Sequence, residues 1–150
     1  MSVFTQVELE LRDIEIVEEV LAEMFGGKVE NCIDCPLPIR GYRGDDRSKL
    51  APTNKNYAPP CHLIVRKENI GAASNDMGIH RRSDGSLTAY ISGYDRRGKL
   101  NEKWVNEVKA KLKTKYAEKM VQRQAKRAGY KVSREIRHDG TVRLRLKRRR

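Results

Sequence analysis

The sequence predicts an α+β fold, with a single antiparallel or mixed sheet and two helices packed on one face. Three observations lead to this prediction. Several segments alternate between apolar and polar residues, which is typical of half-buried strands. Two other segments carry apolar residues at helical spacing. The strands are grouped rather than alternating strictly with helices, and the expected order is β-α-β, a long loop, β-β-β, α and β-β.

The N-terminal part of the chain is expected to contribute a strand, a helix and a short second strand. Residues 3–12 alternate with a period of two, so they are predicted to form a strand. Asp13 follows in the position of a helix N-cap, and residues 14–25 have the apolar spacing of a helix. The glycines at 26 and 27 end this helix. Residues 28–33 are expected to form the short second strand.

The middle of the chain is expected to contain a long loop and three strands. All five prolines lie between residues 34 and 60, so this segment is predicted to be an irregular, Pro-rich loop. Loops of this length are usually functional or mobile. Residues 62–67, 77–82 and 87–94 are predicted strands, and Asp84-Gly85 indicates a hairpin turn between the last two.

The last fifty residues are expected to form a long basic helix followed by a hairpin. Asn101 is in the position of an N-cap, and Gly129 is in the position that ends a helix. Residues 130–137 and 141–147 alternate on either side of a turn. The side chains expected in the core are Trp104, Val108, Leu112, Tyr116, Met120, Val142, Leu144 and Leu146. Residues 1–150 are expected to form one domain.

The positive charge is concentrated toward the C-terminus. The formal net charge is +12, with −6 over residues 1–30, +4 over residues 31–98 and +14 over residues 99–150. This distribution predicts that the C-terminal face binds nucleic acid (RNA or a ribonucleoprotein) or an acidic protein partner. The alternative is a solvated surface that is partly paired with the acidic helix. The candidate binding residues are Lys119, Arg123, Lys126, Arg127, Arg143 and Arg145, with Arg148, Arg149 and Arg150 as a basic tail.

A second candidate binding site is the segment Arg40-Gly41-Tyr42-Arg43-Gly44. A guanidinium group can bind phosphate through two hydrogen bonds, and a tyrosine ring can stack on a nucleobase. A phosphate-binding loop with Arg40, Tyr42 and Arg43 is therefore one interpretation. A tight loop selected only for its backbone shape is the other.

The three cysteines suggest either a metal site or reduced thiols. Their odd number excludes a complete disulfide framework. Cys32 and Cys35 form a C-x-x-C pair, and Cys61 is followed directly by His62, so the four side chains could bind zinc if they meet in space. His80 or His138 could supply the fourth ligand instead. Three partly buried thiols and a redox-active C-x-x-C pair are the alternatives.

The sequence lacks the motifs of an enzyme and the features of a membrane or exported protein. No G-x-S-x-G motif and no phosphate-binding loop of the Walker A type occurs, so we expect no enzymatic activity. No apolar segment is long enough to span a bilayer. The N-terminus carries acidic residues and does not look like a signal or transit peptide. We therefore expect a location in the cytoplasm or the interior of an organelle.

Three groups of short motifs together resemble a known family. They are residues 1–5 followed by the helix at Asp13, the segment 40–44, and the set formed by residues 115–117, 129–132 and 139–144. The chain resembles the family of the hypothetical chloroplast open reading frame thirty-five protein, which occurs in plastids, cyanobacteria, other bacteria and phages. The resemblance covers nearly the whole chain.

This resemblance implies a small α+β domain but no established activity, cofactor or catalytic residue. Members of the family are often thought to accompany ATPases of the AAA class, which implies a role as a protein-interaction adaptor. The chain departs from the usual family pattern in the strand at residues 88–94, in its cysteines and in its strongly basic end.

Overall fold

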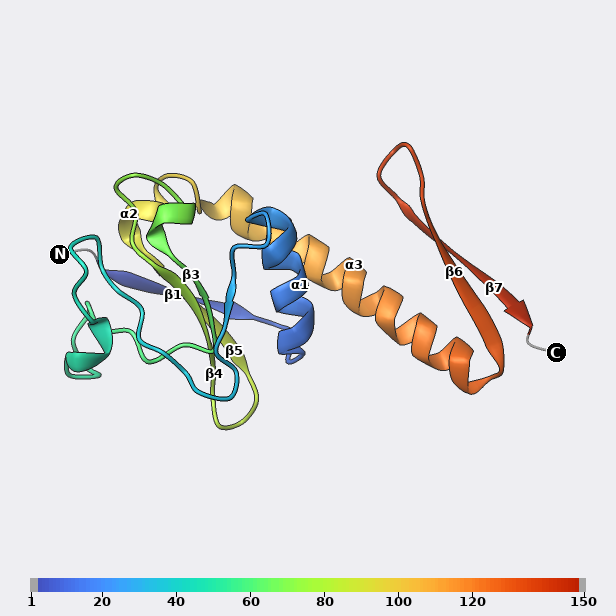
Figure 1. Cartoon of the computed structure of the whole chain (residues 1–150), viewed down its shortest axis with the longest axis horizontal. Coiled ribbons are helices and arrows are strands. Elements are labelled where there is room, and N and C mark those ends of the chain that lie inside the picture. Colours follow the sequence, from blue (N-terminus) through green and yellow to red (C-terminus); the bar gives the residue numbers. More distant parts are fainter. Residues whose placement is uncertain (1–2, 149–150) are drawn as a thin grey trace. The chain divides into compact units, whose positions relative to one another are not determined.

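The computed structural model describes residues 3–148 and confirms the predicted α+β class (Figure 1). The elements are β1 (Phe4–Leu9), α1 (Ile14–Met24), β2 (Glu30–Asn31), β3 (Leu63–Val65), β4 (Met77–Arg81), β5 (Leu87–Ser92), α2 (Gly93–Arg96), α3 (Glu102–Arg127), β6 (Tyr130–Ile136) and β7 (Val142–Arg148). Two short 3-10 helices, Arg47–Lys49 and Lys67–Asn69, lie in the connecting segments. None of the described helices is both long and apolar enough to cross a membrane.

The chain divides into two compact units, Met1–Leu112 and Lys113–Arg150, which are called the N-terminal unit and the C-terminal unit below. The boundary falls inside α3, so this helix contributes to both. The expected single domain over residues 1–150 stays a prediction.

The N-terminal unit is built on a five-stranded antiparallel sheet with the strand order β1-β5-β4-β3-β2. Val7 is opposite Ala89, Ala89 is opposite Ile79, and Ile79 is opposite Leu63, so these four side chains lie on one face of the sheet. That face packs against α1 and the first turns of α3 in a single apolar cluster, which accounts for the two helices predicted on one face.

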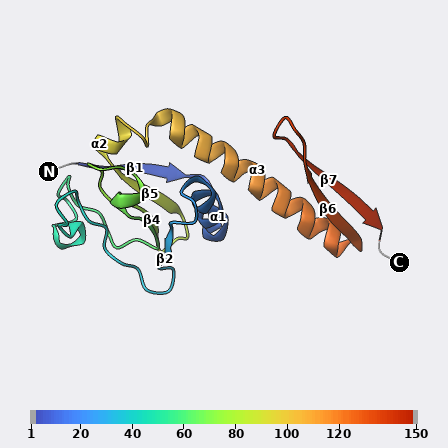
Figure 2. The same cartoon turned by 45° about the horizontal axis from the view of Figure 1, so that its top comes forward.

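The other face of the sheet is covered by the Pro-rich loop. Phe4, Ile64 and Tyr90 point to this side and are buried with Ile39 and Cys61 from the loop and its end. In Figure 2 the loop lies on the opposite side of the sheet from α1. The loop contains no α-helix and no regular strand. Its apolar side chains nevertheless complete the second apolar layer of the unit.

Several local predictions are confirmed by hydrogen bonds at the ends of the helices. Asp13 accepts a hydrogen bond from the backbone N–H of Ile16, and the Asn101 side chain accepts one from that of Trp104. Gly26 and Gly27 follow α1 with φ angles of 59° and 82°, values that favour glycine.

The end of β5 differs from the prediction. The strand was expected to continue to Tyr94, but it ends at Ser92 and the chain turns into the short helix α2. The Ser92 hydroxyl accepts a hydrogen bond from the backbone N–H of Asp95 and donates one to the Asp95 carboxylate. This reciprocal cap stabilises the turn, and it leaves the Tyr94 side chain exposed.

The C-terminal unit differs from the prediction in two respects. β6 and β7 form a separate two-stranded sheet rather than joining the main one. All five side chains of this unit that were expected in the core are less buried than predicted, and Val142 and Leu144 are half-buried. Tyr116 is 42% exposed, Leu146 is 52% exposed and Met120 is only half-buried. A stripe with an interval of four residues advances by about 40° per step around a helix, so it turns away from the buried side within a few turns.

Candidate nucleic-acid interface

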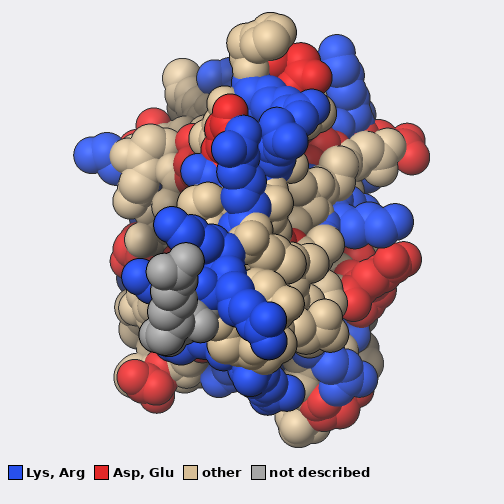
Figure 3. Space-filling view, turned by 90° about the vertical axis from the view of Figure 1, so that its right-hand side faces the viewer, with Lys and Arg blue, Asp and Glu red and all other residues tan. Residues whose placement is uncertain are grey.

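The two units differ sharply in their charge. The N-terminal unit has 17 Lys and Arg and 17 Asp and Glu, so its formal charge is zero. The C-terminal unit has 15 Lys and Arg and only 3 Asp and Glu, which gives a formal charge of +12. The whole net charge of the chain thus belongs to its last 38 residues. Figure 3, which faces the hairpin of the C-terminal unit, shows many Lys and Arg side chains in this view.

The last turns of α3 carry four of the predicted binding residues. Lys119, Arg123, Lys126 and Arg127 fall within an arc of about 100° around the helix, because each residue advances about 100°. Arg123, Lys126 and Arg127 are exposed, and Lys119 is half-buried. These cations also stabilise the helix, because positive charges near the C-terminus of a helix interact favourably with its dipole.

The hairpin presents a second row of cations. Its register places Lys131 opposite Lys147, Ser133 opposite Arg145, and Glu135 opposite Arg143, so these side chains share one face. The predicted residues Arg143 and Arg145 belong to this row and are exposed. Arg148 is exposed at the end of β7, and it belongs to that strand rather than to a tail. Arg149 and Arg150 lie outside the described residues.

The three acidic residues of the C-terminal unit are already engaged. Arg134 contacts Glu118 at 2.5 Å, and Arg145 lies 3.6 Å from Glu135. Asp139 accepts hydrogen bonds from the hydroxyl and the backbone N–H of Thr141, and these bonds lower its pKa. Three carboxylates cannot neutralise fifteen cations, so the unit keeps a large excess of positive charge at its surface.

The opposite face of the hairpin carries apolar side chains together with Arg134 and Arg148, and it is only partly covered. The ion pair between Arg134 and Glu118 connects this face to α3. Val132 and Leu144 are half-buried, whereas Ile136 is 63% exposed. The unit therefore combines a cationic face with apolar side chains that remain accessible.

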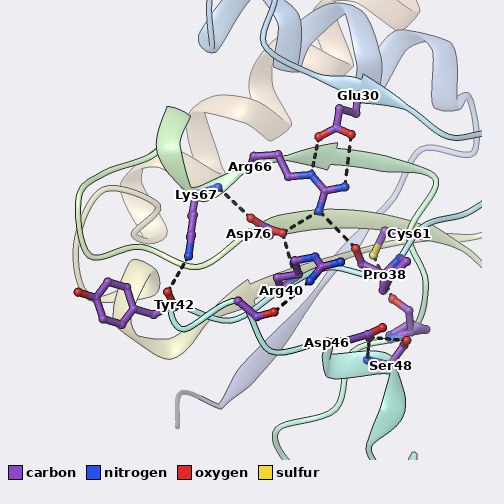
Figure 4. A network of polar contacts seen from close by, with 12 residues as sticks. Glu30, Pro38, Arg40, Tyr42, Asp46, Ser48, Cys61, Arg66, Lys67 and Asp76 are labelled. Atoms are coloured by element: carbon purple, nitrogen blue, oxygen red, sulfur yellow. Dashed lines mark hydrogen bonds and ion pairs between the residues drawn. The ribbon is translucent and has the colours of Figure 1, made fainter.

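The glycine segment at 40–44 has a specific backbone shape in the N-terminal unit (Figure 4). Arg40 donates a side-chain hydrogen bond to the Gly44 carbonyl oxygen, so its guanidinium group supports the loop itself. A Cβ atom at Gly41 would lie only 2.5 Å from the Asp45 carboxylate and 2.7 Å from the Arg47 guanidinium group. Gly41 is therefore required because these side chains approach the backbone closely. This supports the interpretation of a tight loop for Gly41 and Arg40.

Two other members of this segment line an open groove of 640 Å³ in the N-terminal unit. Tyr42 and Arg43 come from the segment, and Tyr94 and Arg97 come from α2 and the residue after it. Sequence reasoning missed Tyr94 and Arg97, because it placed Tyr94 in a strand. The pattern Ser92-x-x-Asp95 was the signal that could have revealed the helix start.

A network of charged residues holds the loop that forms one wall of this groove (Figure 4). Buried Asp76 accepts hydrogen bonds from the backbone N–H groups of Arg40 and Lys67, and from Arg66 at 2.8 Å. Arg66 also pairs with Glu30 on the neighbouring strand. Asp76 therefore joins the Pro-rich loop to the sheet, and these charges serve the fold.

The four predicted zinc ligands differ in burial and in their hydrogen bonds. Cys61 is fully buried, its thiol donates to the Pro59 carbonyl oxygen at 3.4 Å, and burial raises its pKa. Burial also raises the pKa of Cys32, whereas Cys35 is exposed. His62 accepts a hydrogen bond from the Arg81 backbone N–H through Nδ1.

One of the four predicted ligands, His62, lies next to His80. The rings of His62 and His80 are 5.3 Å apart between centroids, and the pKa of His62 is lowered by burial and by the nearby His80 and Arg81. Within residues 3–148, no three His, Cys, Asp or Glu side chains are grouped closely enough to hold a metal ion. The zinc site stays a prediction.

No family model, curated protein or solved structure matches the chain. The class that the fold and the surface define is a small α+β protein with a neutral sheet unit and a strongly basic helix–hairpin unit.

Proposed function

We propose that this chain is a non-enzymatic nucleic-acid-binding protein and that its C-terminal unit contacts the phosphate backbone of RNA or a ribonucleoprotein. The observation that carries this proposal is the +12 charge on residues 113–150, with only three acidic residues among them. A polyanion gains affinity for such a surface because its condensed counterions are released on binding.

The arrangement of the cations supports a backbone contact rather than base reading. Arg143, Arg145 and Lys147 occupy every second position of one strand, which spaces them by about 7 Å along it. The cationic arc of α3 offers a second line of contacts. Aromatic residues are few on this unit, with Tyr116 exposed and Tyr130 half-buried, so we expect little sequence specificity from it.

The absence of enzymatic activity is part of the same proposal. Its support is that the sequence contains no G-x-S-x-G motif and no loop of the Walker A type. A location in the cytoplasm or an organelle interior fits the proposed partner, because RNA is present there.

A second candidate function is that of a protein-interaction adaptor for an AAA-class ATPase or another acidic partner. Ile136 and Leu146 favour it, because phosphate groups offer nothing to these exposed apolar side chains. An acidic protein with apolar residues would engage both faces of the hairpin. The resemblance to the chloroplast open reading frame thirty-five family is retained as a proposal, and this role is the one it implies.

The test is the salt dependence of RNA binding by the purified chain. We expect fluorescence anisotropy to show binding of a labelled RNA at 50 mM salt, and a loss of about a thousandfold in affinity at 200 mM if six phosphates are contacted. A raised absorbance ratio at 260 nm in the purified protein would accompany it. Undetectable binding at low salt would overturn the proposal, and recovery of an ATPase after nuclease treatment would favour the adaptor.

A further inference from the structure

Most of the large apolar side chains that are exposed in the N-terminal unit line its groove. In the described part of this unit, the large apolar side chains that are exposed are Val3, Leu37, Tyr42 and Tyr94. All of these except Leu37 line the same groove. Tyr42 is 54% exposed and Tyr94 is 49% exposed, so both rings are accessible for stacking. Aromatic rings that remain accessible beside one concave surface indicate a ligand-binding site, because rings that serve only packing are buried.

The backbone beneath both rings is fixed by hydrogen bonds. The Tyr42 backbone N–H donates to the side chain of buried Asn75 at 2.8 Å, and its carbonyl oxygen accepts from Lys67 Nζ at 2.6 Å. Tyr94 lies in α2, whose start is held by the reciprocal bonds between Ser92 and Asp95. Asn75 connects the two walls, because its own N–H donates to Asp95 at 3.2 Å. The rings are thus presented by a preformed backbone, which lowers the entropy cost of binding.

The charge of the groove is positive. Arg43 and Arg97 line it, and no carboxylate within residues 3–148 forms an ion pair with either. The acidic residue in the lining, Asp45, is 2.6 Å from buried Arg47 and is neutralised by it. Two guanidinium groups are therefore available to an anionic ligand.

The groove continues into a second hollow, which extends the site beyond one small molecule. This hollow has a volume of 410 Å³, shares Tyr94 and Arg97 with the groove and reaches Lys99. The groove itself, at 640 Å³, falls within the range of about 300–1,000 Å³ typical of small-ligand pockets. An extended ligand could place one unit in each hollow, with Tyr94 and Arg97 between them.

We propose that this groove binds unpaired nucleotides of a single-stranded nucleic acid. Tyr42 and Tyr94 stack on bases, and Arg43 and Arg97 form hydrogen bonds with the phosphates between them. A duplex hides the faces of its bases in its own stack, so the groove selects single strands. The inference rests on the proposed function for the class of partner, and it adds a site in the other unit and a preference for unpaired nucleotides.

The experiment measures the affinity of the full chain for two labelled probes at 50 mM salt, a short oligouridylate and an RNA duplex. We expect Tyr94→Ala to weaken binding of the single strand by about 5- to 150-fold, because stacking on one aromatic side chain contributes that much per base. Arg97→Ala should also weaken it, whereas the affinity for the duplex should change less than about twofold. The matched control is Tyr94→Phe, which keeps the ring and should bind like the wild type.

The outcomes separate this inference from the proposed function. Equal binding of the single strand by Tyr94→Ala and the wild type would overturn the groove site, even if the duplex is bound. An equal loss for both probes would overturn the preference for unpaired nucleotides. Weaker duplex binding when Arg143 and Arg145 are reversed in charge, together with a loss from Tyr94→Ala that is confined to the single strand, would support both sites. A wild type that binds neither probe would overturn both proposals.

Discussion

The two units use the same residue types for different purposes. In the N-terminal unit, where cations and acids are equal in number, Arg47, Arg66 and Arg82 pair with carboxylates and hold the loop and the strands in place. In the C-terminal unit the cations outnumber the acids five to one, and most cannot be paired. Arginine content alone therefore says little about function. What distinguishes the units is whether the charge is satisfied within the fold.

We expect the largest loss of stability when a buried arginine of the N-terminal unit is removed, which tests whether that arginine is structural. Arg47 is 2% exposed, its guanidinium group lies 5.0 Å from the centre of the Phe4 ring, and it donates to the Asn56 carbonyl oxygen. Arg47→Ala would leave Asp45 without its partner and open a cavity, so we expect the free energy of unfolding to fall by about 3 kcal/mol. Urea denaturation measures this.

The matched control for this change is Arg123→Ala in the C-terminal unit, where the side chain is exposed. We expect its effect on the free energy of unfolding to stay within about 0.5 kcal/mol. Similar losses for Arg47→Ala and Arg123→Ala would break the distinction between structural and surface arginines.

A second prediction concerns the close approach of side chains to Gly41 in the N-terminal unit. Gly41→Ala would place a methyl group against the ion pair of Asp45 and Arg47, and we expect a loss of about 2 kcal/mol in stability. Gly98→Ala is the control, because a Cβ atom there meets its nearest neighbours at 3.6 Å and 3.9 Å, which are ordinary contacts. Thermal unfolding compares the two, and equal melting temperatures would contradict the close approach at Gly41.

A third prediction concerns the hairpin of the C-terminal unit. Leu144 is half-buried, so Leu144→Asp should destabilise the hairpin by about 1–2 kcal/mol and speed hydrogen exchange of its amides. Leu146, on the same face, is already more than half exposed, and Leu146→Asp should change the exchange rates little. If the two variants exchange alike, the assignment of Leu144 to the partly covered side is wrong.

The smallest expected effect is a pH dependence in the N-terminal unit. The folded-state pKa of His62 is lowered by burial, so the unfolded chain binds a proton more readily than the folded one. Stability should then fall as the pH decreases through the ordinary histidine range, near 6.5, and stay constant above it. Chemical denaturation of His62→Gln should lose this dependence, whereas His138→Gln in the hairpin turn should retain it.

Much of the fold follows from local patterns in the sequence. The strand near the N-terminus, the caps at Asp13 and Asn101, and the turn at Asp139-Gly140 are decided by neighbouring residues. The structure agrees with each, although the strand expected over residues 3–12 covers only Phe4–Leu9. The burial of Arg47 could not be predicted in the same way. It depends on Asp45, Phe4 and Asn56 meeting in space.

The candidate sites were also predictable only where they depend on local sequence. Formal charge is additive along the chain, so the basic character of the C-terminal unit was predictable from composition. The groove was only half predictable, because Tyr42 and Arg43 belong to a recognisable glycine segment, whereas Tyr94 and Arg97 are brought to them by α2. The exposure of Tyr116 and Leu146 was missed because periodicity shows which side chains share a face, not whether another layer covers it.

We propose that the surface cations of the C-terminal unit bind nucleic acid, whereas those of the N-terminal unit outside the groove do not. The most direct measurement compares two double charge reversals by RNA anisotropy over a range of salt concentrations. One carries Arg143→Glu and Arg145→Glu, and the other carries Lys28→Glu and Lys55→Glu at exposed sites of the N-terminal unit. Both variants change the net charge equally. We predict that the first binds more weakly, with a salt slope reduced by about two, and that the second binds like the wild type. Equal losses in both variants would contradict the account, because the effect would then come from net charge alone.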